Sequence, residues 1–195
     1  MKKYNVIFFT GAGISVDSGI PTFQEQPGIR DKLSRDFVNE NPEEYKNTIK
    51  RMFSLCENAK PNAAHIAIAE SGFPVITMNI DRLHIKAGST EVLEIHGALP
   101  DKEELEDELF VLNYNGIVLY GDLAPKYEIA TKMVNSLEYG NSYFIIVGSS
   151  FYTGISMELY QIAKRRHAII ETINDHASER VPMICDKLKK IGFSL

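Results

Sequence analysis

The stretch VIFFTGAGISVDSGIP, residues 6–21, joins a short apolar run to a cluster of glycine and serine residues. β-Branched and aromatic residues that run into glycines predict a buried strand entering a tight turn. We expect a helix to begin at that turn, where outward-pointing backbone N–H groups attract an anion such as a diphosphate. Gly11 and Gly13 match the first two glycines of a dinucleotide-binding fingerprint, whereas Val16 occupies the third position.

Short apolar runs alternate with longer amphipathic stretches along the rest of the chain. Continuous Val, Ile and Phe runs favour strands that are covered on both faces. Their alternation with helical patterns predicts βαβ units, and therefore an α/β fold with a doubly wound parallel sheet and helices on both faces. The predicted strands are 4–9, 74–78, 91–95, 116–120, 142–148 and 168–174, and the predicted helices are 41–53, 60–72, 125–140 and 156–167.

Two segments interrupt this alternation and predict a small second lobe. Residues 26–59 are long and polar, and residues 99–115 are acidic. We expect one domain over residues 1–195. Its large lobe is predicted to comprise about residues 1–25, 60–98 and 116–195, and the two inserts are predicted to build the small lobe.

The composition argues against several classes of function. A net charge of −5 provides no basic surface for nucleic acid. No apolar run is long enough to span a membrane, and the first residues lack a signal-peptide cleavage site. Cys56 and Cys185 are the only cysteines, too few for a thiolate zinc site or a disulfide framework. We therefore expect a cytoplasmic protein without a bound metal.

Polar residues follow several of the predicted strands at the point where each strand ends. Asn79 and Asp81 follow the strand 74–78, His96 follows 91–95, and Asn174 ends 168–174. Gly148, Ser149 and Ser150 occupy the same place after the run SYFIIV. Ligands of open parallel sheets bind along the carboxyl edge of the strands, so these residues predict a common site.

Several motifs, found in the family's order, carry a resemblance to the sirtuin family. GAGISVDSGIPTF (11–23) resembles the sirtuin motif G-A-G-I-S-x-x-S-G-I-P-D-F-R, and TMNIDRLH (77–84) resembles T-Q-N-I-D-x-L-H. EIHG (94–97) resembles the catalytic L-H-G, and IVLYGDLAP (117–125) is similar to V-x-F-G-E-x-L-P. GSSF (148–151) and the dipeptide IN (173–174) match later segments that contact the nucleotide. The resemblance therefore spans most of the chain.

The resemblance implies a Rossmann-like lobe that binds NAD as cofactor and an enzyme that acts on acyl-lysine protein substrates. The implied reaction cleaves the nicotinamide–ribose bond and transfers the acyl group to ADP-ribose, with His96 as general base and with Asn79 and Asp81 around the reactive ribose. The implied cofactor-binding residues are Gly11, Ala12, Gly13, Ser15, Ile20, Pro21, Phe23, Met78, Ile80, Gly148, Ser149, Ser150 and Asn174. The implied substrate-binding residues are Gly121, Asp122, Leu123 and Phe151.

The chemistry of such a reaction suits these residue types. Nicotinamide leaves as a neutral molecule, so the oxocarbenium-like sugar needs dipoles and carboxylates more than it needs a strong acid. Asn79 and Asp81 offer both. Attack by a hydroxyl then needs a base with a pKa near the working pH, and histidine has such a pKa.

The sequence also departs from the sirtuin pattern. Gln24, Met78 and Thr22 stand where the family usually has arginine, glutamine and aspartate. The four zinc-binding cysteines that usually follow the catalytic histidine are absent. We therefore expect apolar packing to hold the small lobe together in place of a zinc ion, through Leu105, Leu109, Phe110, Val111 and Leu112.

Three functions fit these observations, and the sequence leaves open the acyl chain, the protein substrate and the oligomeric state. The first is an NAD-dependent protein-lysine deacylase of sirtuin type. The second is an NAD glycohydrolase or ADP-ribosyltransferase, which would use the same NAD site with another acceptor. The third is a non-catalytic sensor of NAD or ADP-ribose. A sensor needs no base, so the presence of His96 beside Asn79 and Asp81 argues against the third.

Overall fold

Five parallel strands form one sheet in the order β3-β2-β1-β4-β5. The computed structural model describes residues 2–26, 28–107 and 116–193. The chain winds outward from the central β1 to β3 and then crosses over to β4, so the winding direction reverses between β1 and β4. The predicted doubly wound parallel sheet is confirmed. The strands are β1 (Val6–Thr10), β2 (Val75–Thr77), β3 (Val92–Glu94), β4 (Tyr143–Val147) and β5 (Ile169–Ile173).

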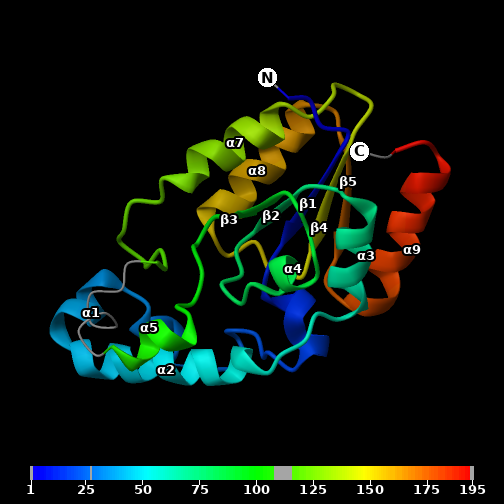
Figure 1. Cartoon of the computed structure of the whole chain (residues 1–195). Coiled ribbons are helices and arrows are strands. Elements are labelled where there is room, and N and C mark those ends of the chain that lie inside the picture. The colour runs from blue at the N-terminus through cyan, green and yellow to red at the C-terminus, as the bar shows by residue number, and fades with distance from the viewer. Residues whose placement is uncertain (1, 27, 108–115, 194–195) are drawn as a thin grey trace.

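Helices cover both faces of the sheet, with α3 and α9 on one side and α7 and α8 on the other (Figure 1). Along β1 the side chains alternate between two core clusters, as a strand buried on both faces requires. Val6 and Phe8 pack in the cluster with α3 and α9, whereas Ile7 and Phe9 pack in the cluster with α7 and α8. These helices are α3 (Ala63–Ser71), α7 (Lys126–Asn135), α8 (Gly154–Arg165) and α9 (Ala177–Lys190).

The ends of α3 illustrate how local sequence fixes the helix boundaries. The Asn62 side chain accepts a hydrogen bond from the Ala64 N–H at 3.0 Å, and Gly72 stops the helix in a left-handed conformation with φ of 71°. The predicted stop at Gly72 is confirmed. By contrast, α7 ends at Asn135 rather than continuing to Gly140, and α9 was not predicted.

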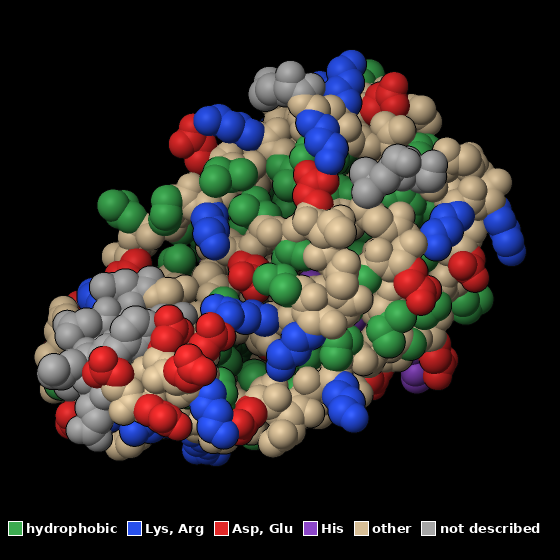
Figure 2. All heavy atoms as spheres, viewed as in Figure 1, with side chains coloured by type: hydrophobic (Ala, Val, Ile, Leu, Met, Phe, Trp, Pro, Cys, Tyr) green, Lys and Arg blue, Asp and Glu red, His purple; other side chains and the backbone are tan. Residues whose placement is uncertain are grey.

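The other helices gather at the carboxyl ends of the strands (Figure 1). A third core cluster joins α2 to later parts of the chain: Tyr45 and Ile49 of α2 pack with Leu99, Leu105 and Ile117. Acidic side chains surround α5 in this region (Figure 2). The helices here are the 3₁₀ helices η1 (Ala12–Ser18) and η2 (Arg30–Lys32), together with α1 (Arg35–Glu40), α2 (Pro42–Glu57), α4 (Leu83–Lys86) and α5 (Lys102–Glu106).

The prediction of a strand at 116–120 is wrong. This segment makes only isolated bridges, Gly97 with Ile117 and Ser34 with Tyr120, and it does not join the sheet. Ile117 and Leu119 are instead buried in the third core cluster. An apolar run has the same sequence pattern whether a sheet or a set of helices covers it. Of the residues expected to hold the small lobe together, Leu105 is buried there, and residues 109–112 lie outside the described residues.

The glycine turn after β1 packs directly against the end of β4. A Cβ atom on Gly13 would lie 2.6 Å from the Gly148 Cα, and one on Gly11 would lie 2.7 Å from the Gly148 carbonyl oxygen. The Gly13 N–H donates to that carbonyl at 3.0 Å, and the Gly11 N–H donates to the Val147 carbonyl at 2.9 Å. The expectation that these N–H groups point outward is therefore wrong for Gly11 and Gly13. Their lack of a side chain allows the turn to pack against the backbone of Gly148.

Two buried histidines lie beneath the loop that follows β2. The rings of His65 and His84 are 4.8 Å apart between centroids, and both side chains are inaccessible or nearly so. Thr10 bonds His84 and Asn62 bonds His65, while His65 Nε2 and His84 Nδ1 have no hydrogen-bond partner within the described part of the chain. Burial lowers the pKa of His65 to about 4 and that of His84 to about 3, so both rings are neutral at physiological pH.

Gly13→Ala should lower the free energy of unfolding by about 1–3 kcal/mol, because the new methyl group would overpack the Gly148 backbone. The matched control is Gly154→Ala at the start of α8, where a Cβ atom meets nothing within 4 Å. Urea unfolding followed by circular dichroism measures both variants. Equal free energies of unfolding for the two variants would show that the close approach of Gly13 to Gly148 does not contribute to stability.

Acid should destabilise the fold through the two buried histidines. The unfolded chain binds protons at an ordinary histidine pKa of about 6.5, whereas the native rings stay neutral until about pH 4. The free energy of unfolding should therefore fall as the pH drops below about 6.5, by up to about 1.4 kcal/mol per pH unit for each histidine. Urea titrations between pH 7.5 and 4.5 should show a flatter slope for His84→Gln. His176→Asn, at an exposed position, serves as control and should keep the wild-type slope.

Candidate active site

A groove of about 440 Å³ runs along the carboxyl ends of all five strands. This volume lies in the range of pockets that bind small molecules and cofactors. The groove is bordered by the sheet on one side and by η2 and the segment around Tyr120 on the other. Its lining residues are Ala12, Gly13, Thr22, Phe23, Gln24, Arg30, Met78, Asn79, His96, Tyr120, Gly148, Ser149, Ser150, Tyr152, Thr153 and Asn174.

A smaller pocket of about 60 Å³ adjoins the groove and shares five lining residues with it, Ala12, Thr22, Phe23, Met78 and Asn79. The residues that line only this pocket are Ser15, Ile20, Pro21, Gln26, Ile29, Met52, Leu55, Cys56, Ile80 and Asp81. Most of them are apolar, and the Asp81 carboxylate provides the negative charge. The pocket can therefore receive a small, partly apolar group with a few hydrogen-bonding atoms.

A buried network centred on Ser15 connects the glycine turn to the loop after β2. The Ser15 hydroxyl donates to Asp81 Oδ2 at 2.7 Å and accepts from Asn79 Nδ2 at 3.1 Å. Ser15 is 1% exposed, and Asn79 and Asp81 are 8% and 7% exposed. Ser15 was expected to face the diphosphate and ribose, but its hydroxyl is engaged in orienting the two residues predicted to surround the reactive sugar.

Backbone interactions hold the loop after β2 in shape. The second Asp81 oxygen accepts from the N–H of Leu83, the first residue of α4, at 2.9 Å. The Asn79 N–H donates to the Thr77 hydroxyl at 3.0 Å, and the Ile80 carbonyl accepts from Leu99 N–H at 2.9 Å. The side chains of Asn79 and Asp81 are consequently held on a rigid backbone.

His96 lies two residues after the end of β3, and both of its ring nitrogens are hydrogen-bonded within the protein. Nδ1 is 3.2 Å from the Met78 carbonyl oxygen, and Nε2 is 2.8 Å from the Tyr127 hydroxyl. Burial lowers the pKa of His96, and the hydrogen bond to the Met78 carbonyl opposes this effect. Burial therefore favours the neutral ring near physiological pH, the form of histidine that can act as a base.

Aromatic residues and one arginine form the mouth of the groove. The guanidinium of Arg30 lies over the ring of Tyr120 at 5.4 Å and over that of Tyr152 at 5.8 Å, and its Nε donates to the Tyr120 hydroxyl at 3.2 Å. These three residues were not among the predicted site residues. Tyr120 precedes Gly121 and Tyr152 follows Phe151, two residues expected to bind substrate. This adjacency in the sequence could have identified both tyrosines.

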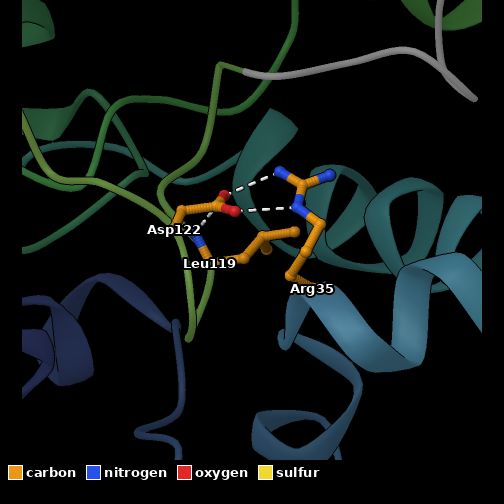
Figure 3. A network of polar contacts seen from close by, with 3 residues as sticks. All are labelled: Arg35, Leu119 and Asp122. Atoms are coloured by element: carbon orange, nitrogen blue, oxygen red, sulfur yellow. Dashed lines mark hydrogen bonds and ion pairs between the residues drawn. The ribbon is translucent and has the colours of Figure 1, made fainter.

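Asp122 was predicted to bind substrate, but its carboxylate is occupied by Arg35 (Figure 3). Arg35 Nε and Nη2 each donate to a different oxygen of Asp122 at 2.7 Å, and the Leu119 N–H adds a bond of 3.2 Å. The bidentate guanidinium lowers the pKa of the Asp122 carboxyl. The pair thus ties α1 to the segment that follows Leu119, while the neighbouring Leu123 is 93% exposed.

The structure brings most of the predicted site residues to the groove and the adjoining pocket. His96, Asn79 and Asp81 line them, as do Ala12, Gly13, Ser15, Ile20, Pro21, Phe23, Met78, Ile80, Gly148, Ser149, Ser150 and Asn174. Within the described chain, Gly11 and the four predicted substrate-binding residues, Gly121, Asp122, Leu123 and Phe151, are not among the lining residues. The roles assigned to all of these residues stay predictions.

The donor set of the groove suits a dinucleotide. Serine and asparagine side chains lie at the end near β4 and β5, and a neutral histidine with a buried amide and carboxylate lies at the other end. No group of three or more His, Cys, Asp or Glu side chains able to hold a metal ion occurs within residues 2–26, 28–107 and 116–193. Over the same residues, no helix is both long and apolar enough to cross a membrane.

Comparison with solved structures shows a closely related architecture. A Sir2 homologue in complex with NAD superposes with a TM-score of 0.81 at 23% identity, covering 95% of this chain and 90% of the other. Sir2Tm bound to a propionylated peptide superposes with a TM-score of 0.74 at 28% identity, covering 96% and 92%. At such identities the first likeness describes the fold alone.

Comparison with protein sequences identifies the family. The profile described as "Sir2 family" matches residues 11–105. An NAD-dependent protein deacetylase of Thermotoga maritima is 33% identical, with 86% of this chain and 80% of that protein aligned. The NAD-dependent protein deacylase 2 of Archaeoglobus fulgidus is 32% identical, with 96% and 86% aligned. With this identity over most of both chains, and with the fold and groove described above, the protein belongs to the Sir2 family, the sirtuins.

Proposed function

We propose that this protein is an NAD-dependent protein-lysine deacylase that cleaves the nicotinamide–ribose bond and transfers the acyl group to ADP-ribose. The observation that carries the proposal is the shared groove: the neutral imidazole of His96 and the buried pair Asn79 and Asp81 line adjoining cavities at the carboxyl edge of the sheet. The names of the relatives, NAD-dependent protein deacetylases and a deacylase, support the same activity.

The pocket around Asn79 and Asp81 suits the first chemical step. Cleavage of the nicotinamide–ribose bond develops positive charge on the sugar, and a preorganised carboxylate or amide dipole stabilises that charge most when water is excluded. Ser15 fixes both side chains in place by donating to one and accepting from the other. The apolar walls formed by Ile20, Pro21 and Ile80 fit the face of the departing nicotinamide ring.

His96 suits the second step, the transfer of the acyl group. A ribose hydroxyl that attacks the activated acyl carbon must lose its proton, and a neutral imidazole accepts it at physiological pH. The hydrogen bond from Nδ1 to the Met78 carbonyl fixes the orientation of the ring and stabilises the positive charge that forms when Nε2 takes up the proton.

The residues that depart from the sirtuin pattern raise the question of which acceptor the reaction uses. Gln24 and Met78 line the groove itself, and the Thr153 hydroxyl bonds the Met78 sulfur at 3.4 Å. The loss of an arginine removes a permanent charge and a bidentate donor. These substitutions are the reason why water or another nucleophile must be tested as acceptor alongside acyl-lysine.

No zinc-dependent step is part of the proposal, because the residues present do not fit the metal. Cys56 and Cys185 are the only cysteines in the sequence. Burial raises their pKa values to about 12 and about 11, so both are protonated thiols rather than metal-binding thiolates. We propose that the apolar cluster around Tyr45, Leu99 and Leu105 supports the small lobe instead, with residues 26–59 and 99–115 as its material.

Incubation with NAD, with and without an acetyl-lysine peptide, should separate the candidate activities. We expect O-acetyl-ADP-ribose by mass spectrometry only when peptide is present, and we expect His96→Ala to abolish this product while much of the NAD affinity, measured by calorimetry, remains. Free ADP-ribose without peptide would indicate a glycohydrolase, and a mass shift on a protein would indicate a transferase. Unchanged NAD would indicate a sensor and would contradict the proposal.

Asp81→Asn should slow release of nicotinamide by about 10²–10³-fold, the usual effect of removing one preorganised electrostatic contact to a developing charge. The substitution keeps the size of the side chain and removes its negative charge. Asp186→Asn, at an exposed position on α9, is the matched control and should release nicotinamide at the wild-type rate. A wild-type rate for Asp81→Asn would remove this residue from the proposed mechanism.

A further inference from the structure

The catalytic base predicted in this protein has no free nitrogen. Nδ1 of His96 is bonded to the Met78 carbonyl and Nε2 to the Tyr127 hydroxyl, at 3.2 and 2.8 Å. A ligand in the groove therefore cannot give a proton to His96 unless one of these two bonds changes. The identity of the bond that changes follows from the donor and acceptor properties of the two partners.

The two bonds have opposite directions. A carbonyl oxygen can only accept, so Nδ1 of the neutral ring carries the hydrogen and Nε2 holds the lone pair. The Tyr127 hydroxyl then donates to Nε2. Burial raises the pKa of Tyr127, and its neighbour Tyr120 adds to this effect, so the phenol keeps its proton at neutral pH. The lone pair that would serve as the base is thus occupied by a tyrosine proton.

Tyr127 approaches His96 from outside the ligand groove. It lies in the first turn of α7, where its N–H bonds the Ala124 carbonyl at 3.0 Å, and its ring packs against the core cluster between the sheet and α8. His96 lines the groove, whereas Tyr127 is not among the described lining residues. A ligand in the groove consequently meets the imidazole first, and it competes with the phenol for Nε2.

We infer that Tyr127 is a positioning residue that holds the Nε2 lone pair of His96 in the free enzyme and yields it to a ribose hydroxyl when NAD binds. This inference rests on the proposed function, because it assigns NAD to the groove. The ribose hydroxyl replaces the phenol as donor to Nε2. In the reaction the proton of that hydroxyl moves to Nε2 as its oxygen bonds to the acyl carbon. The bond between that carbon and the lysine nitrogen then breaks with the lysine amine as leaving group, and Tyr127 retains its own proton throughout.

The contact has two consequences for the base. Donation by Tyr127 favours the neutral form of His96, so it keeps the base ready to accept a proton over a wider pH range in the free enzyme. The other titratable groups around the pair are Glu94 on β3, Lys126 beside Tyr127 on α7, and Tyr120. None of these three changes between the wild type and a Tyr127→Phe variant, so that variant isolates the phenolic hydroxyl.

The test compares Tyr127→Phe with Tyr143→Phe, a half-buried tyrosine at the start of β4 that packs against Phe193. Both variants are measured as a function of pH with saturating peptide. The acid limb of the pH profile of kcat/KM for NAD reports the pKa of His96 before NAD binds, and the acid limb of the pH profile of kcat reports its pKa in the complex. In Tyr127→Phe the limb of kcat/KM should move to higher pH by about half a unit. The limb of kcat should not move. The KM for NAD should fall by about two- to tenfold, because no internal hydrogen bond needs to be broken.

Other kinetic outcomes would overturn the inference. If neither limb moves, Tyr127 does not act on the base. If both limbs move together, the phenol keeps its bond to Nε2 in the complex. If kcat falls more than a hundredfold while NAD affinity is unchanged, Tyr127 carries the proton itself. Tyr143→Phe should match the wild type in every respect, and thermal unfolding checks that both variants are folded.

A measurement on the wild type needs neither a variant nor turnover. With ¹³C-labelled tyrosine, addition of ADP-ribose should move the Tyr127 Cζ resonance, since the phenol loses its acceptor, and should leave that of Tyr143 in place. With ¹⁵N-labelled histidine, the His96 Nδ1–H tautomer should persist. If calorimetry shows that ADP-ribose binds and the Tyr127 resonance does not move, the inference is wrong. If ADP-ribose does not bind at all, the proposed function itself fails.

Discussion

The contact of Gly11 and Gly13 with Gly148 is the constraint on which the rest of this structure depends. At this point the ends of β1 and β4 approach so closely that no Cβ atom fits on either glycine of the turn. The approach brings η1 under the end of β4 and places Ser15 within hydrogen-bond distance of Asp81. Glycines in a nucleotide-binding turn are usually explained by the approach of a ligand. Here the same residues must first allow two strands of the protein to meet.

From this contact the site is assembled by short polar interactions of buried groups. Ser15 orients the carboxylate and the amide of the loop after β2, and Met78 and Tyr127 orient the imidazole of His96. On the other side of the groove, the bidentate pair of Arg35 and Asp122 fixes the segment that carries Tyr120. A carboxylate held by a guanidinium in this way organises the wall of the site, and it is not available to contact a ligand unless the pair opens.

Much of the fold was predictable because it depends on local patterns. Buried parallel strands are continuous apolar runs, and helix ends such as Asn62 and Gly72 are marked by residues with known backbone preferences. The residues at the strand ends were predictable as a group, because a parallel sheet brings its carboxyl ends to one edge. The segment 116–120 was not, since its apolar residues match a strand and in fact fill the core of the small lobe.

The sequence by itself determined the five strands of the sheet, the helices α2, α3, α7 and α8, and the presence of His96, Asn79 and Asp81 at one edge of the sheet, because periodicity and motif spacing are properties of neighbouring residues. Only the tertiary structure decided which atoms these side chains bond. Tyr127 lies 31 positions from His96, and Asp122 lies 87 positions from Arg35. No local pattern links such residues. These residues meet only because α7 and α1 pack against the rest of the chain, and that packing requires the whole fold.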